Sequence, residues 1–290
     1  MSLTDQVRGT ARGIAEQARS VTIDVDALTA LDPGPPPGLD AERHYLEGAP
    51  EQVAHYLLVL DSVNFGSGWF PTLRKRPGLS GYFTVASALT DFWRASGGWS
   101  VDELRALRAE DVSGVLDQDA GHELMTLYAK ALRDLGHFLG ARRALDLVAE
   151  ADGSAERLAS MLAAGMPFYD DAGFWKRAQI VPNDLALAGV ARFDDLDRLT
   201  IFADNLVPHV LRVDGVLRYD PALAARIDAG ELLPPCREER EIRGCAVHAC
   251  ELLSERIGMP PRLIDTALWT RGQARRYKAV PRHRTRTVFY

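Results

Sequence analysis

The sequence predicts a mainly α-helical protein with a compact multi-helix fold. Apolar residues recur at spacings of three and four, most clearly over residues 122–150, and this period favours helix over strand. The chain lacks the alternation of strands and helices typical of a Rossmann fold, and it is too helical for a sandwich. With 290 residues, 47% of them hydrophobic, it can bury a substantial core. We expect one domain over residues 1–290, within which a smaller helical part, residues 1–150, could pack against residues 151–290.

The first half of the chain is expected to consist of helices joined by short connections. Residues 4–19 form an amphipathic pattern, and residues 20–25 are expected to be either a short extended piece or the start of the next turn. The prolines and glycines of residues 31–38 predict a rigid linker. A helix over residues 41–47 would carry His44. Further helices are expected over residues 80–94, 101–116 with Asp102 as a candidate N-cap, and 122–150 with a break near Gly136 or Gly140.

The second half is expected to be equally helical. The predicted helices cover residues 154–164, a short helix from its N-cap Asn183 to Ala191, and residues 206–211, 221–229, 236–257 and 261–270. The Asp-Gly pair at residues 214–215 is typical of a hairpin turn, but its flanks favour a helix that ends at Gly215. The tail, residues 281–290, alternates in polarity and could be extended against the body.

Composition restricts the classes of partner. The net charge of −6 argues against binding nucleic acid through bulk charge, although a local basic pocket for one phosphate stays allowed. Cys236, Cys245 and Cys250 form no CxxC pair, which predicts free thiols in a reducing compartment. The first 20 residues lack the apolar core of a signal peptide, and no run reaches transmembrane length. We therefore expect a cytoplasmic protein with no membrane partner; its oligomeric state is not indicated.

Asp204 lies inside the apolar run of residues 199–208 and admits two interpretations. As a structural residue it would cap a helix over residues 206–211, in which Pro208 suits the first turn. As a functional residue it would be a carboxylate held in an apolar setting two residues after Phe202, where a charge is costly unless it is paired or hydrogen-bonded.

Two further carboxylates stand near aromatic residues. Asp265 precedes Trp269 by one helical turn, and Asp61 precedes Phe65 and Trp69. Carboxylates beside aromatic rings suit a planar heterocycle whose edge is read by acceptors, as in an N-glycosidase or a base-flipping glycosylase.

Motifs for other chemistries are missing from the sequence. It contains no HExxH, no Cys/His cluster, no phosphate-binding glycine loop and no GxSxG, so these residues predict neither a metal site nor a serine nucleophile. Lys176 and Arg177 follow an aromatic-rich connection and could be either a solvated helix start or part of an anion and base-stacking site.

Six blocks in sequence order resemble the queuosine salvage protein family, the queuosine 5′-phosphate N-glycosylase/hydrolases. They are residues 61–65 (DSVNF), 176–180 (KRAQI), 200–204 (TIFAD) with Pro208, 241–245 (EIRGC), 264–269 (IDTALW) and 281–286 (PRHRTR) with a terminal aromatic pair. The resemblance covers nearly the whole chain. It implies a fold distantly similar to DNA glycosylases, and hydrolysis of queuosine 5′-phosphate to queuine and ribose 5-phosphate without a cofactor.

The resemblance also implies roles for individual residues. Asp204 resembles the family's catalytic aspartate, which would stabilise an oxocarbenium-like transition state or bond to C1′ transiently. Phe202 would stack on the base, Asp265 would accept hydrogen bonds from its guanine-like edge, and His44 would contact the base or its cyclopentenediol. The remaining residues expected at the substrate are Trp269, Thr266, Thr270, Lys176 and Arg177, the last two at the 5′-phosphate or the ribose.

One position departs from the family's pattern. Members often have an acidic residue directly after the tryptophan of the 264–269 block, where this chain has Thr270. If that acid contacts the cationic aminomethyl group of the substrate, its absence leaves the substrate's identity open, although Asp61 or another carboxylate could substitute.

Ordinary structural roles and other functions stay open at this point. His44 would by default be a surface or capping histidine, and Phe202 and Trp269 would be core aromatics. One alternative function is a non-enzymatic protein that binds queuine or a related deazapurine. Another is a glycosylase that acts on a base within nucleic acid, against which the acidic balance speaks.

Overall fold

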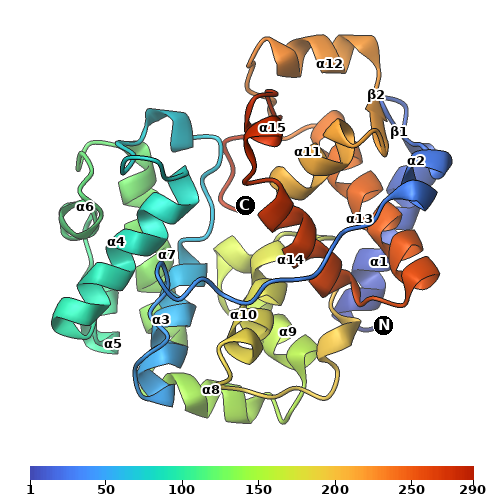
Figure 1. Ribbon diagram of the computed structural model, residues 1–290. Coiled ribbons are helices and arrows are strands. Elements are labelled where there is room, and N and C mark those ends of the chain that lie inside the picture. The colour runs from blue at the N-terminus through green and yellow to red at the C-terminus, as the bar shows by residue number, and fades with distance from the viewer.

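The computed structural model describes residues 1–290 and contains fifteen α-helices, three short 3-10 helices and one two-stranded sheet (Figure 1). The predicted mainly α class is therefore confirmed. In Figure 1, helices α3 to α8 form a group on the left, and α1, α2 and α11 to α15 form a group on the right. Helices α9 and α10 lie below and between them. None of the helices combines the length and the apolar character needed to cross a bilayer.

The left-hand group begins after the proline-rich linker. Its elements are α3 (Pro50–Ser62), the 3-10 helix η1 (Phe70–Thr72), α4 (Gly81–Ser96), α5 (Val101–Ala106), α6 (Ala109–Leu116), α7 (Glu123–Leu139) and α8 (Ala144–Glu150). Ser100 caps α5 by accepting from the amide of Glu103 at 3.3 Å, so the prediction of Asp102 as the cap is wrong by two residues. Gly140 ends α7, as one of the two predicted breaks.

The right-hand group joins the two ends of the chain. Its elements are α1 (Leu3–Gln17), β1 (Val21–Ile23), α2 (Val25–Ala30), α11 (Leu206–Val213), β2 (Leu217–Tyr219), α12 (Pro221–Asp228), α13 (Arg237–Ile257), α14 (Pro261–Arg271) and α15 (Arg275–Lys278). Strands β1 and β2 are antiparallel, with Val21 opposite Tyr219. Helix α1 packs on α13, where a Cβ at Gly244 would lie 2.6 Å from Cγ2 of Ile14. The first helices thus accompany the C-terminal ones, and a subdomain division at residue 150 stays a prediction.

The central part of the molecule contains helices α9 and α10, of which α10 is the more deeply buried. Its elements are α9 (Ala155–Gly165), η2 (Pro167–Tyr169), α10 (Lys176–Leu187) and η3 (Leu196–Arg198). Residues 176–185 are all buried, because α10 packs on both α3 and α9. Asn183 lies inside α10 and does not begin a helix, so that prediction is wrong. Packing on two sides keeps the helix continuous past Pro182, a residue type that by itself disfavours a helix interior.

Two other predicted elements differ from the structure. Residues 41–47 form only a turn, in which the amides of Arg43 and His44 donate to the carbonyl of Asp40 at 3.0 and 2.9 Å. The predicted helix there is wrong, because an isolated turn so close to Pro50 is too short to propagate. Helix α11 ends at Val213 and not at Gly215, whose φ of 82° turns the chain into β2.

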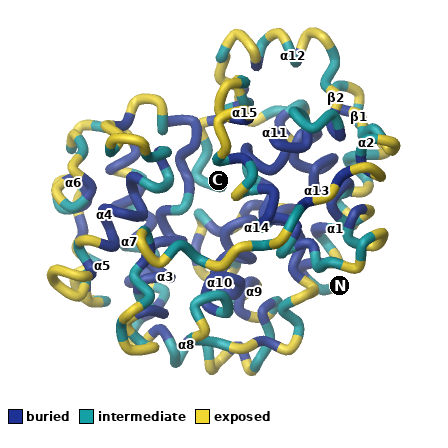
Figure 2. Tube along the Cα trace, in the orientation of Figure 1, coloured by how far each residue is buried: buried dark blue, intermediate teal, exposed yellow.

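The C-terminal residues lie between the two groups of helices (Figure 1). Residues 281–290 form no regular element apart from an isolated bridge between Arg284 and Leu232, and the amide of Gly66 donates to the carbonyl of Tyr290 at 3.0 Å. Gly68 leaves room for this segment, since a side chain there would collide with the carbonyl of Thr285. Figure 2 shows that the buried parts of α10, α13 and α14 converge on the same central region.

Candidate active site

Two adjoining hollows of about 560 and 550 Å³ open between the groups of helices. They share lining residues, among them Asn64, Tyr82, Lys176, Asp204 and Trp269, so they form one cleft. We call one part the cationic half, because it adds Lys75, Arg282 and Arg284 to these residues. The other part is the acidic half, because it adds Asp184 and Asp265, together with His44, Phe83 and Phe202.

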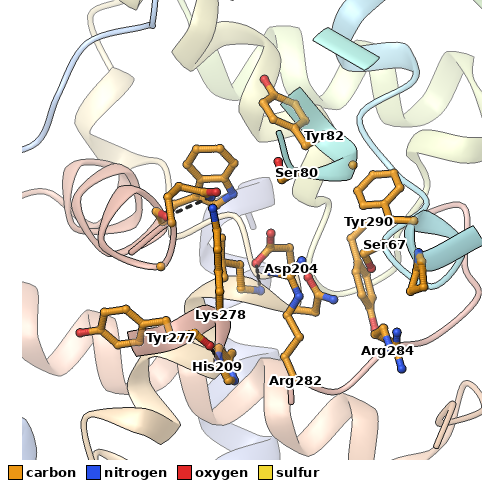
Figure 3. A pocket seen from close by; sticks show the side chains of 18 of the residues that line it. Ser67, Ser80, Tyr82, Asp204, His209, Tyr277, Lys278, Arg282, Arg284 and Tyr290 are labelled. Atoms are coloured by element: carbon orange, nitrogen blue, oxygen red, sulfur yellow. Dashed lines mark hydrogen bonds between the residues drawn. The ribbon is translucent and has the colours of Figure 1, made fainter. Parts of the chain in front are cut away.

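Asp204 stands where the two halves meet (Figure 3). Its Oδ1 accepts hydrogen bonds from the amides of Leu206 at 2.7 Å and Val207 at 3.1 Å. The capping interpretation is therefore confirmed in its contacts, although Asn205 occupies the N-cap position itself. Because only one oxygen is used in this way, Oδ2 stays available to a ligand, and the helix end fixes the carboxylate in place.

The cationic half contains side chains without partners. Lys75, Lys278 and Arg282 line it, and none of the three makes a side-chain hydrogen bond or an ion pair with the rest of the protein; Lys278 also lines the rim shared with the acidic half. Arg284 donates to the carbonyl of Gly230 at 3.0 Å. In Figure 3 the side chain of Arg282 extends toward Asp204. Burial lowers the pKa of Arg282, and the charge of Asp204 opposes this shift. Unpaired cations in a cleft favour an anionic ligand.

The acidic half is walled by aromatic rings. The ring of Trp269 meets those of Tyr82 and Phe83 edge to face, with centroids 5.4 and 5.5 Å apart. Phe202, which is 5% exposed, lines the same half. Such walls suit an aromatic heterocycle, because ring pairs add stacking to the burial of apolar area.

Asp265 supplies a buried acceptor within this half. It is 5% exposed, and its Oδ1 accepts from the amide of Phe202 at 2.8 Å. Burial raises the pKa of Asp265 well above its usual range, and the charge of Asp204 raises it further. Thr266 on the same helix donates its hydroxyl to the carbonyl of Arg262 at 3.0 Å, and the exposed Thr270 lines the edge of the half.

His44 is buried beside Tyr82. Its Nδ1 lies 2.8 Å from the carbonyl oxygen of Asp40, and its Nε2 lies 3.0 Å from the Tyr82 hydroxyl. A carbonyl can only accept, so Nδ1 carries the proton, and burial lowers the pKa of His44 and favours the neutral ring. Nε2 then accepts from the Tyr82 hydroxyl, whose oxygen keeps lone pairs for a ligand donor.

Lys176 and Arg177 separate, because adjacent residues of a helix point in different directions. Lys176 lines both halves, and its Nζ donates to the backbone carbonyl of Asn64 at 3.0 Å and to the Asn64 side chain at 3.2 Å. Burial lowers the pKa of Lys176 to about 8, while the nearby Asp204 opposes the shift.

Arg177 lies outside the cleft. Its guanidinium donates to the carbonyls of Ser62 at 2.8 Å, Val288 at 2.7 Å and Phe168, and it lies 4.7 Å from the ring centroids of Phe65 and Tyr169. It lines neither half. The expected contact between Arg177 and the substrate is therefore corrected: this side chain joins α3, η2 and the C-terminal segment.

The structure brings most of the expected residues together and adds some that the sequence did not indicate. Of the nine residues expected at the substrate, all except Arg177 line the cleft. Lys278, Arg282 and Asp184 are additions. The basic block at residues 281–286 was visible in the sequence, but nothing local indicated which of its arginines points inward.

The fold and cleft define a protein suited to a small aromatic ligand with an anionic end. Residues 44–290 match the family model described as queuosine salvage protein. The chain is 33% identical to a protein of Sphaerobacter thermophilus named queuosine 5′-phosphate N-glycosylase/hydrolase, over 97% of this chain and 96% of that one. Proteins with the same name from Mus musculus and Bos taurus are 27% and 29% identical, each over 98% of both chains. The chain belongs to the queuosine salvage protein family.

Proposed function

We propose that this protein hydrolyses the N-glycosyl bond of queuosine 5′-phosphate and releases queuine and ribose 5-phosphate. The observation that carries the proposal is the position of Asp204, whose free Oδ2 belongs to a residue at the junction of a cationic and an acidic half-cleft. A nucleotide has the matching polarity, with a phosphate at one end, a base at the other and the anomeric carbon between them. The names of the similar proteins support the same substrate.

The base would occupy the acidic half. Asp265 would accept from the N1–H and the exocyclic amine of the guanine-like edge, while Phe202 and Trp269 cover the ring. His44 would act through the Tyr82 hydroxyl that it already orients, or contact the base side arm directly. Thr266 and Thr270 would line the edge of this half.

The phosphate would occupy the cationic half. Lys278 and Arg282 have donors without acceptors in the protein, so a phosphate would meet charge-assisted hydrogen bonds without breaking any. Lys176 lies closer to the junction and would serve the ribose or the carboxylate of Asp204. These assignments replace the one expected for Arg177.

The reaction would pass through an oxocarbenium-like state. As the bond between C1′ and the base nitrogen breaks, the electron pair leaves with the base and positive charge develops on C1′ and the ring oxygen. Oδ2 of Asp204 would stabilise that charge, either through space or by a transient bond to C1′. A water oxygen then bonds to C1′, any bond between C1′ and Oδ2 breaks with its electron pair returning to the carboxylate, and the proton that the water loses balances the one taken up by the base nitrogen. Because Oδ1 is held by two amides, the carboxylate needs little reorganisation.

The direct test is incubation with queuosine 5′-phosphate and chromatographic detection of the free base. Asp204→Asn should reduce release by about a thousandfold while binding queuine with unchanged affinity. Asp220→Asn is the matched control, because Asp220 also caps a helix, α12, but lines neither half of the cleft. Unchanged turnover by Asp204→Asn would reject the catalytic assignment. Tight queuine binding without release by the wild type would favour the non-enzymatic alternative.

We expect the substrate to be the free nucleotide and not a base within nucleic acid, since the net charge is −6. The three cysteines are free thiols, which suits the reducing environment of the cytoplasm.

A further inference from the structure

The inner wall of the acidic half contains a second group of acceptors, contributed by α3 and α10. Asn183 and Asp184 line the cleft and are 2% and 8% exposed. Asp61 is fully buried on α3, which packs on α10, and the charge of Asp184 is among the causes that raise the pKa of Asp61. None of the three residues has a role in the function proposed above.

This group has more acceptors than donors. The side-chain amide of Asn183 donates to Oδ1 of Asp184 at 3.1 Å, and the amide of Asn64 donates to Oδ1 of Asp61 at 3.5 Å. Oδ1 of Asn183 and Oδ2 of Asp61 are buried and have no donor at all. A buried acceptor without a donor is unfavourable, so a ligand that brings N–H groups would supply the missing hydrogen bonds.

No cation is paired with this group, although the charges of Lys176 and Arg177 act on Asp61 from nearby. Neither Asp61 nor Asp184 forms an ion pair, and the nearby ammonium of Lys176 donates to Asn64. Burial accordingly raises the pKa of Asp184 to about 6 and that of Asp61 well above its usual range. Asp40, which lines the same half, differs because Arg43 pairs with it.

We infer that Asp184, together with Asn183 and with Asp61 behind it, binds a protonated amine carried by the base of the substrate. This inference rests on the proposed function, because queuosine bears a secondary amine on the side arm of its deazaguanine ring, protonated at neutral pH. The ammonium N–H groups donate to the Asp184 carboxylate and to Oδ1 of Asn183. The acidic half thereby selects amine-bearing bases over neutral bases with the same ring, without a charge at Thr270.

The test compares two deazaguanines that differ in the charge of the side arm. The affinities of 7-aminomethyl-7-deazaguanine, which is cationic, and 7-cyano-7-deazaguanine, which is neutral, are measured by calorimetry at neutral pH. The wild type should prefer the cationic base by about tenfold or more, as expected for a charged hydrogen bond. Asp184→Asn should reduce the preference to less than about threefold, with the loss confined to the cationic base.

Three results would overturn the inference: equal affinities of the wild type for the two bases, an unchanged preference in Asp184→Asn, or an equal loss of affinity for both bases in that variant. Glu251→Gln is the matched control, since it makes the same change to a largely buried carboxylate outside the cleft. Should Asp184→Asn fail to fold, as judged by circular dichroism, Asp61→Asn must weaken the same preference or the inference fails.

Binding is measured without hydrolysis, so this outcome and that of the proposed function are separable. Release of queuine from queuosine 5′-phosphate by the wild type would stand even if both bases bound equally. Conversely, a loss of affinity of Asp184→Asn for the cationic base alone would support the inference even if no hydrolysis were found.

Discussion

The two halves of the cleft differ in which groups lack a hydrogen-bond partner: donors in the cationic half and acceptors in the acidic half. In the cationic half, Lys75, Lys278 and Arg282 lack acceptors, whereas Asn183 in the wall of the acidic half and Asp61 behind that wall have buried oxygens that lack donors. Most charged side chains elsewhere are paired across the surface, as in the ion pair of Arg94 with Glu47. The contrast supports the proposal of a ligand that is anionic at one end and rich in N–H donors at the other.

A second contrast explains why the expected basic pair divides. Lys176 and Arg177 are neighbours in sequence and both are buried, yet Lys176 faces the cleft and Arg177 donates to three backbone carbonyls. A guanidinium has five N–H donors and can therefore bind several backbone carbonyls at once, which suits Arg177 to a structural role. Of the two residues only Lys176 lines the cleft, where we propose that it serves the ribose or the carboxylate of Asp204.

Among changes confined to one half of the cleft, the largest effect on catalysis is expected when the charges of the cationic half are removed. The double variant Lys278→Met and Arg282→Met should lower kcat/KM for the 5′-phosphate by about a hundredfold or more, because two charge-assisted hydrogen bonds are lost. The value for the corresponding nucleoside should change by less than about threefold. Steady-state kinetics with both substrates measure the difference. Equal losses for nucleotide and nucleoside would remove the phosphate from this half, and Lys130→Met, a surface change, should affect neither.

A smaller effect is expected when Asp265, the carboxylate proposed to bind the guanine-like edge of the base, is replaced. Asp265→Asn should weaken queuine binding by about 10- to 100-fold, since an amide offers one acceptor oxygen and no charge. Its oxygen can still accept from the amide of Phe202, so the fold should persist. Calorimetric titration with queuine measures this, and unchanged affinity would show that Asp265 does not contact the base.

The acidic half should also make base binding depend on pH. The pKa of Asp265 is raised in the free protein, and donors from a bound base favour the ionised form and lower it. Binding then releases a proton, so affinity should rise with pH between the two pKa values, by at most about tenfold per pH unit for one group. Asp184, with a pKa of about 6, contributes with the same sign. Titrations from about pH 5 to about pH 8 measure the slope, which Asp265→Asn should flatten; an affinity that falls with pH would contradict it.

The smallest expected effect is on stability. The pKa of Asp61 is raised in the folded state, so the folded protein binds more protons and stability declines as pH rises from the unfolded pKa through the folded one. Asp61→Asn should therefore raise the free energy of unfolding by about 1 kcal/mol at about pH 8 and by less at about pH 5. Thermal unfolding at the two pH values tests this. A variant destabilised equally at both would mean that the carboxylate is satisfied in a way the unpaired Oδ2 does not suggest.

Local signals predicted much of the fold and part of the site. Helical periodicity and capping residues identified most helices, and the apolar run around Asp204 marked both its capping contacts and its place in the cleft. The misses share a cause. The turn at residues 41–47 and the uninterrupted α10 depend on what packs against them, and a single sequence does not contain those partners.

The sequence by itself determined the helical class, the family resemblance and the two carboxylates Asp204 and Asp265, because each depends on periodicity or on a short ordered block. Only the tertiary structure decided which charged groups remain without partners. Asp184, Lys278 and Arg282 come from separate elements, and their pairing depends on distances between helices far apart in the chain. A charged side chain is available to a ligand only when no other residue of the fold pairs with it, and the spacing of residues along the sequence does not indicate which distant residues come close.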